Sequence, residues 1–146
     1  MSDDEVRAFL EEERTVTCAT NGRDGWPHLM PLWYVLRDDE LWSWTYAKSQ
    51  KVRNLERDPR VTLQVEAGET YDQLRGVMLR ARAVIHRDPD AVAALGTEIF
   101  TRYSGGHPLD DATRAMIARQ APKRVGLQFV EEARITWDHR KLGGVD

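Results

Sequence analysis

Residues 41–65 join two strand patterns through a short basic helix, and this combination limits the folds open to the chain. Leu41–Thr45 is short, apolar and aromatic, as expected of a buried strand, and Val61–Val65 alternates between apolar and polar residues. Between them, Ser49 is a candidate N-cap for a helix that ends near Asp58, because the Asp58–Pro59 pair cannot continue it. The segment therefore predicts a strand, a helix and a strand in close succession.

The start of this predicted helix carries a concentration of positive charge. Lys48 and Ser49 precede the helix, while Lys51 and Asn54 lie three residues apart and so share one helix face. Free backbone N–H groups and the positive end of the helix dipole already favour an anion there, so lysines are unfavourable unless something negative binds. The sequence therefore predicts an anion site, and a phosphate is its natural ligand.

The remaining sequence predicts antiparallel strands with helices around them. An amphipathic helix begins at Ser2, where Glu5 completes a capping box, and two further helices are expected over 88–103 and 110–120. Alternating patterns predict six strands, at 15–20, 26–36, 41–45, 61–65, 74–86 and 124–137. Hairpin signals such as Asn21–Gly22 dominate, so a closed antiparallel barrel is favoured over a parallel sheet.

Two prolines, Pro27 and Pro31, lie inside the predicted strand over 26–36. Proline lacks the donor that a central strand needs, so these positions belong to a sheet edge, a bulge or a break that faces a ligand. Trp42 and Trp44 share one face of the next strand, a pattern more typical of a core or a dimer interface than of a stacking platform.

Composition and charge restrict the class of protein. A chain of 146 residues suits a single domain over 1–146, and a net charge of −3 argues against nucleic acid as a partner. No apolar run approaches the roughly 18 residues of a membrane span, and the acidic N-terminus does not resemble a signal peptide. A single cysteine, Cys18, fits a reducing cytosol. We therefore expect a cytoplasmic protein without a membrane partner.

No side chain of the sequence is an obvious catalyst. The four histidines fall in separate segments without metal-ligand spacing, and Cys18 fits best as a core residue of the first strand. Paired carboxylates such as Asp38–Asp39 lie in turns. We therefore assign no catalytic residue and no metal ligand, and a redox reaction carried by a bound cofactor fits better.

Several motifs, taken in order, resemble one family. They are Gly25–His28, Pro31–Tyr34, Thr45, Ser49-x-Lys51-x-x-Asn54-Leu55, Asp58–Val61 and Ile135–Leu142. Together they resemble the flavin-binding split β-barrel family related to pyridoxamine-phosphate oxidases, and within it the branch that uses the deazaflavin coenzyme F420. The resemblance covers nearly the whole chain. It implies a mainly β (α+β) fold, a six-stranded antiparallel split β-barrel with peripheral helices.

The same resemblance implies which residues bind the cofactor. Six would hold its phosphate and the start of its polar tail: Thr45, Lys48, Ser49, Lys51, Arg53 and Asn54. Three would lie along its ring: Pro31, Leu32 and Trp33. Some relatives carry an arginine where Ser49 stands, and Lys48 would compensate for that missing charge.

The resemblance also implies a homodimer with each cofactor between two chains. Lys123 and Arg124 could then serve the partner's site, and the tail Trp137–Lys141 is either part of a neighbouring pocket or a docking strand end. The implied function is an F420H2-dependent oxidoreductase that delivers a hydride to an unsaturated or conjugated small molecule. Two alternatives stay open: an FMN-dependent oxidoreductase of the pyridoxamine-phosphate oxidase type, and a non-catalytic F420-binding carrier.

Overall fold

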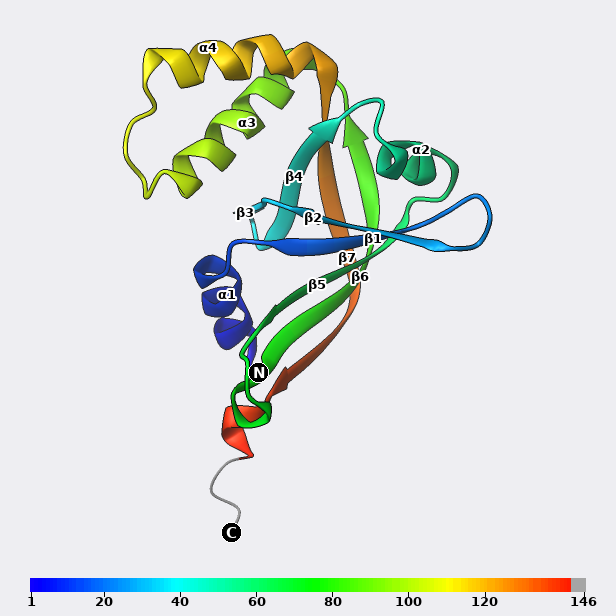
Figure 1. The fold of residues 1–146 in the computed structure, drawn as a ribbon, viewed down its shortest axis with the longest axis vertical. Helices are drawn as coiled ribbons and strands as arrows, with labels where there is room; N and C mark the ends of the chain where they lie inside the picture. The colour runs from blue at the N-terminus through cyan, green and yellow to red at the C-terminus, as the bar shows by residue number, and fades with distance from the viewer. Residues whose placement is uncertain (143–146) are drawn as a thin grey trace.

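The computed structural model describes residues 1–142, which form one curled antiparallel sheet with four α-helices around it (Figure 1). In sheet order the seven strands are β2 (Pro27–Leu32), β1 (Val16–Asn21), β5 (Arg60–Ala67), β6 (Arg75–His86), β7 (Arg124–Asp138), β4 (Glu40–Tyr46) and β3 (Val35–Arg37). All neighbouring strands pair antiparallel. The predicted mainly β, split-barrel fold is confirmed. However, the end strands β2 and β3 do not pair with each other, so the barrel is open rather than closed.

The predicted strand over 26–36 is two strands in the structure, which is why the sheet has seven strands instead of six. The chain leaves the sheet at Trp33 and Tyr34, because other elements bind their backbone groups. The Ser43 hydroxyl of β4 donates to the Trp33 carbonyl at 2.6 Å, and the Tyr34 amide donates to the Tyr103 hydroxyl at 3.0 Å. These bonds replace the sheet hydrogen bonds that a continuous strand would have made.

The prolines of β2 lie on an edge strand, which is one of the three alternatives predicted from the sequence. β2 pairs only with β1, and Pro27 and Pro31 are opposite Asn21 and Thr17. A missing amide donor is tolerated at such an edge, and it also makes the edge a poor template for another strand.

Two apolar cores flank the sheet. The larger fills the barrel with alternating strand residues such as Leu63, Leu79 and Leu127, and it is closed by Phe9 from helix α1 (Asp3–Glu12). The smaller lies between β4 and helix α3 (Pro89–Tyr103), and it contains Trp44, so the core interpretation of this tryptophan is confirmed. The predicted parity of the strand at 74–86 is confirmed by its alternating burial. In the strand at 124–137 the predicted Val125, Leu127 and Phe129 are buried, but residues 130–135 are all exposed, so the alternation does not continue along the strand.

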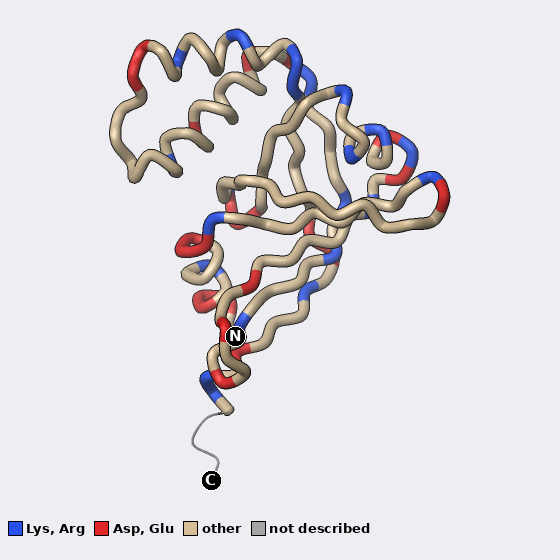
Figure 2. Tube along the Cα trace, in the orientation of Figure 1, with Lys and Arg blue, Asp and Glu red and all other residues tan. Residues whose placement is uncertain are grey.

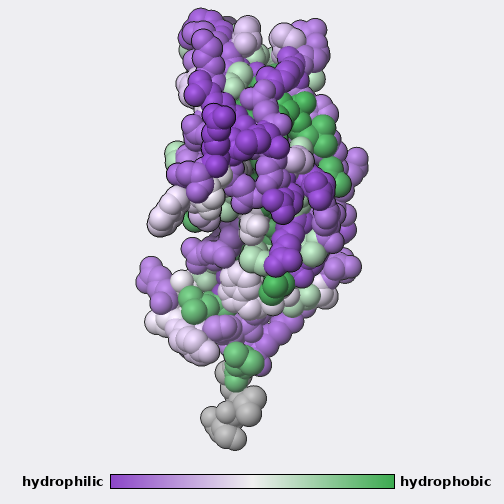
Figure 3. All heavy atoms as spheres, turned by 90° about the vertical axis from the view of Figure 1, so that its right-hand side faces the viewer, coloured by the Kyte–Doolittle hydropathy of each residue, from purple (hydrophilic) through white to green (hydrophobic). Residues whose placement is uncertain are grey.

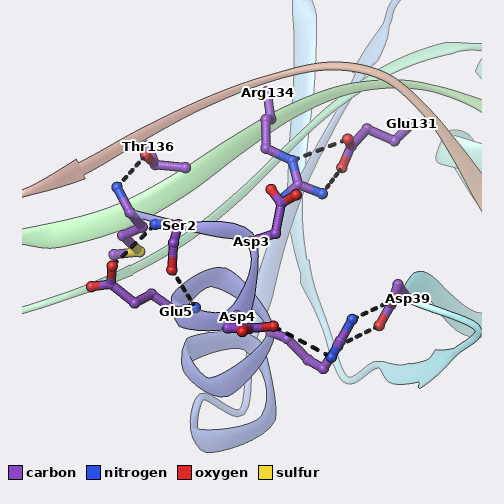
Figure 4. Close-up of polar contacts among 10 residues, drawn as sticks. Ser2, Asp3, Asp4, Glu5, Asp39, Glu131, Arg134 and Thr136 are labelled. Carbon is purple, nitrogen blue, oxygen red and sulfur yellow. Dashed lines mark hydrogen bonds and ion pairs between the residues drawn. The ribbon is translucent and has the colours of Figure 1, made fainter.

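Helix α1 is attached by its buried apolar residues and by polar contacts, and Figure 4 shows the polar contacts. Its capping box is formed, since the Ser2 and Glu5 side chains exchange bonds with each other's backbone amides. Arg7 makes a bidentate pair with Asp39 in the turn before β4, and Arg134 of β7 lies between Asp3 and Glu131. Exposed pairs of this kind contribute about 0–1 kcal/mol each, so the buried apolar face of α1 supplies most of its attachment.

Two further helices complete the fold. Helix α2 (Gln50–Arg57) lies between β4 and β5, and helix α4 (Asp111–Gln120) packs against α3 to form a helical pair at one end of the barrel (Figure 1). These match the predicted helices, with Ser49, Asp88 and Asp110 at their N-cap positions. In residues 1–142 no helix has the length and apolar character needed to cross a bilayer.

The contact between Gly96 of α3 and the Trp44 ring gives a test of the smaller core. A Cβ atom at Gly96 would lie 2.5–2.9 Å from three ring atoms of Trp44. We expect Gly96→Val to lower the free energy of unfolding by about 1–3 kcal/mol, because the helix must move away from the sheet. Urea denaturation followed by circular dichroism measures this. Ala94→Val, on the exposed side of the same helix, is the control, and equal effects would contradict the packing argument.

Candidate functional site

The basic residues predicted from the sequence gather around α2, between β4 and β5 (Figure 2). β4 ends at Tyr46, whose carbonyl accepts from the Ser49 amide at 3.0 Å, and the helix begins one residue later. The predicted order of strand, helix and strand is confirmed. Helices α1, α3 and α4 each have an acidic residue in the first turn, whereas α2 has none. The positive end of this helix therefore lacks the usual compensating charge.

Lys51 is a buried cation. Its side chain is 7% exposed, and its Nζ donates to the Thr45 hydroxyl of β4 at 2.8 Å. No carboxylate of residues 1–142 forms a salt bridge with it. Burial lowers the pKa of Lys51, and the nearby positive charge of Arg124 lowers it further. An anion bound here would relieve both effects.

Arg124, the first residue of β7, is the second cation of this site. It is opposite Tyr46 in the sheet register, and its guanidinium lies over the Tyr46 ring at 4.1 Å and the Trp44 ring at 4.4 Å. Its Nε is buried without a hydrogen-bond partner. Sequence reasoning considered Arg124 only for a partner's site, whereas in the structure its positive charge acts on Lys51 of its own chain. The Arg124 side chain lies on the Trp44 and Tyr46 face of β4, and Thr45, which binds Lys51, points to the other face. The pairing of β4 with β7 is non-local, so the sequence pattern carried no signal for it.

The hydroxyl of Ser49 is a further unpaired group at the same place. Ser49 is in the N-cap position of α2, but its side chain makes no capping bond, and its Oγ is buried without a partner. A buried hydroxyl that bonds nothing is unfavourable unless a ligand supplies the partner. The donors of Lys51, Arg124 and Ser49 together fit an acidic group such as a phosphate.

Two more predicted residues, Lys48 and Arg53, are exposed around this cluster. Lys48 and Lys123 line a cavity of about 600 Å³ together with Tyr46, Ala47, Ser49 and Pro122. The Ala47 amide donates to the Lys123 carbonyl at 2.9 Å, which fixes the two basic segments side by side. The face of the molecule that carries α2 is mainly hydrophilic, with small apolar patches (Figure 3).

Asn54 is fully buried, and its amide is used within the chain. Its Nδ2 donates to the Thr20 hydroxyl of β1 at 3.0 Å, and its Oδ1 accepts from Gln50 at 2.9 Å. In the structure Asn54 therefore attaches α2 to β1, and its predicted contact with a cofactor stays a prediction. On its side of α2, Gln50 and Asn54 line a second cavity of about 500 Å³ with the β1–β2 hairpin, including Trp26 and His28.

Strand β4 connects the basic cluster to the segment predicted to lie along a ring. Ser43 and Thr45 are two residues apart and both buried, so their side chains point to the same face of the strand. Ser43 bonds the Trp33 carbonyl and Thr45 bonds Lys51. At about 3.3 Å per residue, these two contacts lie about 7 Å apart. The contact that holds Lys51 and the contact that holds the Trp33 carbonyl are therefore neighbours on one buried face of β4.

The barrel is open beside this segment. Met30 of β2 is opposite Cys18 of β1, and cross-strand partners share a face, yet Cys18 is buried while Met30 is 42% exposed. Pro31 is exposed, Leu32 packs against the core, and the Trp33 side chain is 46% exposed. Cys18 is buried in the larger core, which confirms the prediction of a core residue. Burial also raises the pKa of its thiol to about 12, which disfavours the thiolate that a nucleophile needs.

The C-terminal segment docks on its own chain. Trp137 packs against Gly76 of β6, the His139 amide donates to the Leu74 carbonyl at 2.8 Å, and Lys141 pairs with Glu5. These contacts favour the docking strand end of the two interpretations that the sequence left open. In the part of the chain that the structure describes, no three histidine, cysteine or acidic side chains gather where they could hold a metal ion.

Comparison with known proteins identifies relatives of this fold. Residues 2–137 match the family model described as pyridoxamine 5'-phosphate oxidase. A conserved hypothetical protein from Mycobacterium tuberculosis is 45% identical with a TM-score of 0.89, over 98% of this chain and 88% of that one. No curated protein matches this sequence.

Two more distant solved structures share the fold alone. An F420 reductase is 23% identical with a TM-score of 0.68, over 88% of this chain and 94% of that one. A FAD-binding protein from Mesorhizobium loti is 18% identical with a TM-score of 0.69, over 93% and 94% of the two chains.

The buried charge of Lys51 should lower the stability of the ligand-free protein, although the same charge favours binding of an anion. We expect Lys51→Met to raise the free energy of unfolding of the ligand-free protein by about 1 kcal/mol at neutral pH, because an apolar side chain avoids desolvating a cation. Denaturant unfolding of both proteins across pH measures this.

The stability of the wild type should depend on pH through the ionisation of Lys51. Because the folded-state pKa of Lys51 is lowered, the unfolded chain binds more protons between that pKa and the ordinary value of 10.5, so the wild type gains stability as pH rises there. The advantage of Lys51→Met must therefore shrink toward pH 10.5. A variant less stable than the wild type at every pH would contradict this interpretation.

Proposed function

The chain belongs to the pyridoxamine 5'-phosphate oxidase family, and from that membership we propose that it is an F420-dependent oxidoreductase, which transfers a hydride from the reduced deazaflavin to an unsaturated or conjugated small molecule. One observation carries the proposal. Lys51, Arg124 and the Ser49 hydroxyl are buried or orphaned donors with no acidic partner in residues 1–142. The Thr45 hydroxyl that binds Lys51 lies about 7 Å along β4 from the Ser43 hydroxyl that binds the Trp33 carbonyl.

Each part of the site has a separate task in this proposal. Lys51 binds the cofactor's phosphate as a point charge, while the Arg124 guanidinium and the Ser49 hydroxyl donate directed hydrogen bonds to it. The first backbone N–H groups of α2 have no intrahelical partner and point to the same place. The cofactor supplies the hydride chemistry when bound, which agrees with a site that has no catalytic side chain.

The segment Pro31–Trp33 serves the ring in this proposal. Its two ends are fixed by β2 and by the Ser43 bond, so the ring meets a preformed wall rather than a mobile loop. Pro31, Leu32 and Trp33 are apolar, and apolar side chains beside the ring keep water away from the position of hydride transfer. Lys48 and Lys123 lie on the cavity next to the phosphate, where an acidic tail would continue.

Two alternatives have support of their own. FMN carries the same kind of phosphate, and the family's own description is a pyridoxamine 5'-phosphate oxidase, so an FMN-dependent oxidoreductase uses the same cations. A non-catalytic F420 carrier is consistent with the lack of a catalytic side chain. Turnover with a panel of quinones, enones and nitroaromatics separates the oxidoreductase from the carrier, because a carrier binds the cofactor without turnover.

Cofactor titration tests the proposal directly. We expect F420 to quench tryptophan fluorescence with micromolar affinity or better. Lys51→Ala should weaken binding by about 1.5–3 kcal/mol, or about 10-fold to 150-fold, because a charge-assisted contact is lost. Arg119→Ala, an exposed arginine on α4, is the control and should bind as the wild type does. Tight binding of FMN without F420 would favour the FMN alternative, and binding of neither would overturn the proposal.

We also propose that the protein is a homodimer with the cofactor at the subunit interface. The β2 region exposes large apolar side chains: Trp26 is 76%, Leu29 57% and Met30 42% exposed. Leu29 and Met30 are consecutive, so their side chains point to opposite faces of this edge strand. Exposed large apolar side chains are typical of protein–protein interfaces. They lie next to the opening of the barrel, so a second chain bound there would also cover the ring segment.

Sedimentation of a charged variant tests the dimer. We expect the wild type to sediment as a dimer and Leu29→Glu to sediment as a monomer, because a carboxylate would be desolvated in the interface. The variant should also bind F420 more weakly than the wild type. Ala118→Glu, on the exposed side of α4, is the matched control. A wild type that stays monomeric at high micromolar concentration would exclude this assembly.

A further inference from the structure

One arginine joins three parts of the fold. Arg102, near the end of α3, donates five hydrogen bonds. Their acceptors are the carbonyls of Leu10, Glu11, Glu13 and Tyr34 and the hydroxyl of Tyr103, at 2.7–3.0 Å. The guanidinium also lies over the Tyr34 ring at 4.5 Å. No carboxylate of residues 1–142 forms a salt bridge with it.

On one side, Arg102 caps the end of α1. Leu10, Glu11 and Glu13 lie in or just after the last turn of that helix, whose carbonyls lack intrahelical partners, and a cation suits this negative end of the helix dipole. The buried Tyr34 hydroxyl donates to two of the same carbonyls, Leu10 at 2.6 Å and Glu13 at 3.1 Å. Burial raises the pKa of Tyr34 to about 12, so the hydroxyl keeps its proton and remains a donor.

On the other side, Arg102 and its neighbour Tyr103 hold the break between β2 and β3. Arg102 donates to the Tyr34 carbonyl at 2.7 Å, and the Tyr34 amide donates to the Tyr103 hydroxyl at 3.0 Å. The Trp33 ring stacks on the Tyr103 ring with centroids 4.3 Å apart and planes 10° apart. Both the backbone and the exposed ring of the break are therefore fixed by the end of α3.

The position of the break depends on these side chains because the sheet does not hold it. Residues 33 and 34 lie between β2 and β3 and pair with no strand. The Ser43 hydroxyl holds the Trp33 carbonyl from β4, and Arg102 with Tyr103 holds Tyr34 from α3. Without the Arg102 guanidinium, only the Ser43 bond to Trp33 and the Tyr103 bond to Tyr34 would hold the backbone between β2 and β3.

We propose that Arg102 is a positioning residue of the cofactor site, which sets the distance between the Trp33 segment and the cations at Lys51. This inference rests on the proposed function, because it assigns the Trp33 segment to the ring of a bound cofactor. Arg102 touches neither the ring nor the phosphate. Arg102 acts on the site through Tyr34 and Tyr103. Because it also binds the end of α1, the position of the Trp33 segment depends on how α1 is docked.

The test separates the two ends of the cofactor. We expect Arg102→Met to weaken binding of F420 by about 10-fold, while binding of inorganic phosphate at Lys51 stays unchanged, because only the ring segment is displaced. Arg102→Lys should be intermediate, since an ammonium cannot reach all the acceptors of a planar guanidinium. Arg119→Met is the control. Binding is measured by calorimetry at a temperature at which circular dichroism shows each variant to be folded.

A spectroscopic signal reports on the ring segment itself. In protein labelled with 5-fluorotryptophan, the ¹⁹F resonance of Trp33 is assigned from Trp33→Phe. Arg102→Met should shift this resonance and leave that of Trp137, at the opposite end of the barrel, in place. A general loss of structure would move both.

The outcomes distinguish this inference from the proposed function. A wild type that binds neither F420 nor FMN overturns the proposed function, and the role given to Arg102 with it. If the wild type binds cofactor and Arg102→Met binds equally well with an unmoved Trp33 resonance, the positioning role alone is wrong. An equal loss of phosphate and cofactor affinity would also overturn it, because that result indicates damage beyond the ring segment.

Discussion

The buried ammonium of Lys51 is the constraint around which the site is organised. A cation with a threonine hydroxyl as its hydrogen-bond partner is a poor choice for stability, and its repulsion by Arg124 makes the choice worse. At an effective dielectric constant of about 20, two opposite unit charges at 4 Å attract by about 4 kcal/mol, so a bound anion offsets much of this cost. The unfavourable charge of Lys51 is therefore the physical basis for proposing an acidic ligand at this site.

The fold provides this arrangement by combining one local segment with one distant strand. Residues 45–54 supply Thr45, Ser49 and Lys51 within a single strand–helix connection, so their proximity is determined locally. Arg124 arrives from the last strand, because β7 pairs with β4 and places it opposite Tyr46. The rings of Trp44 and Tyr46 hold its guanidinium, while α3 packs closely over Trp44 through Gly96. The smaller core thus stabilises the site from the outside of the barrel.

This division explains what the sequence could and could not predict. Local signals were sufficient for the helices, for the strand parity and for the basic start of α2, since capping residues and alternating patterns act within a few positions. The break at Trp33 was not predictable, because it depends on Ser43, Arg102 and Tyr103, which are 10 to 69 residues away from the groups they bind. The inward use of Asn54 was missed for the same reason: a shared helix face does not reveal whether it meets a ligand or β1.

The same division bears on how such a barrel selects a cofactor. In the proposed function, Lys51, Arg124 and Ser49 bind an acidic group, and a phosphate is common to F420 and FMN, so these residues alone cannot distinguish the two. Discrimination must come from the parts that differ, which are the ring and whatever follows the phosphate. In the proposed function, the ring would meet the segment held from β4 and α3, and the group beyond the phosphate would meet the cavity of Lys48 and Lys123. Selectivity is therefore a property of long-range packing and of exposed lysines, both of which can change while the anion site stays the same.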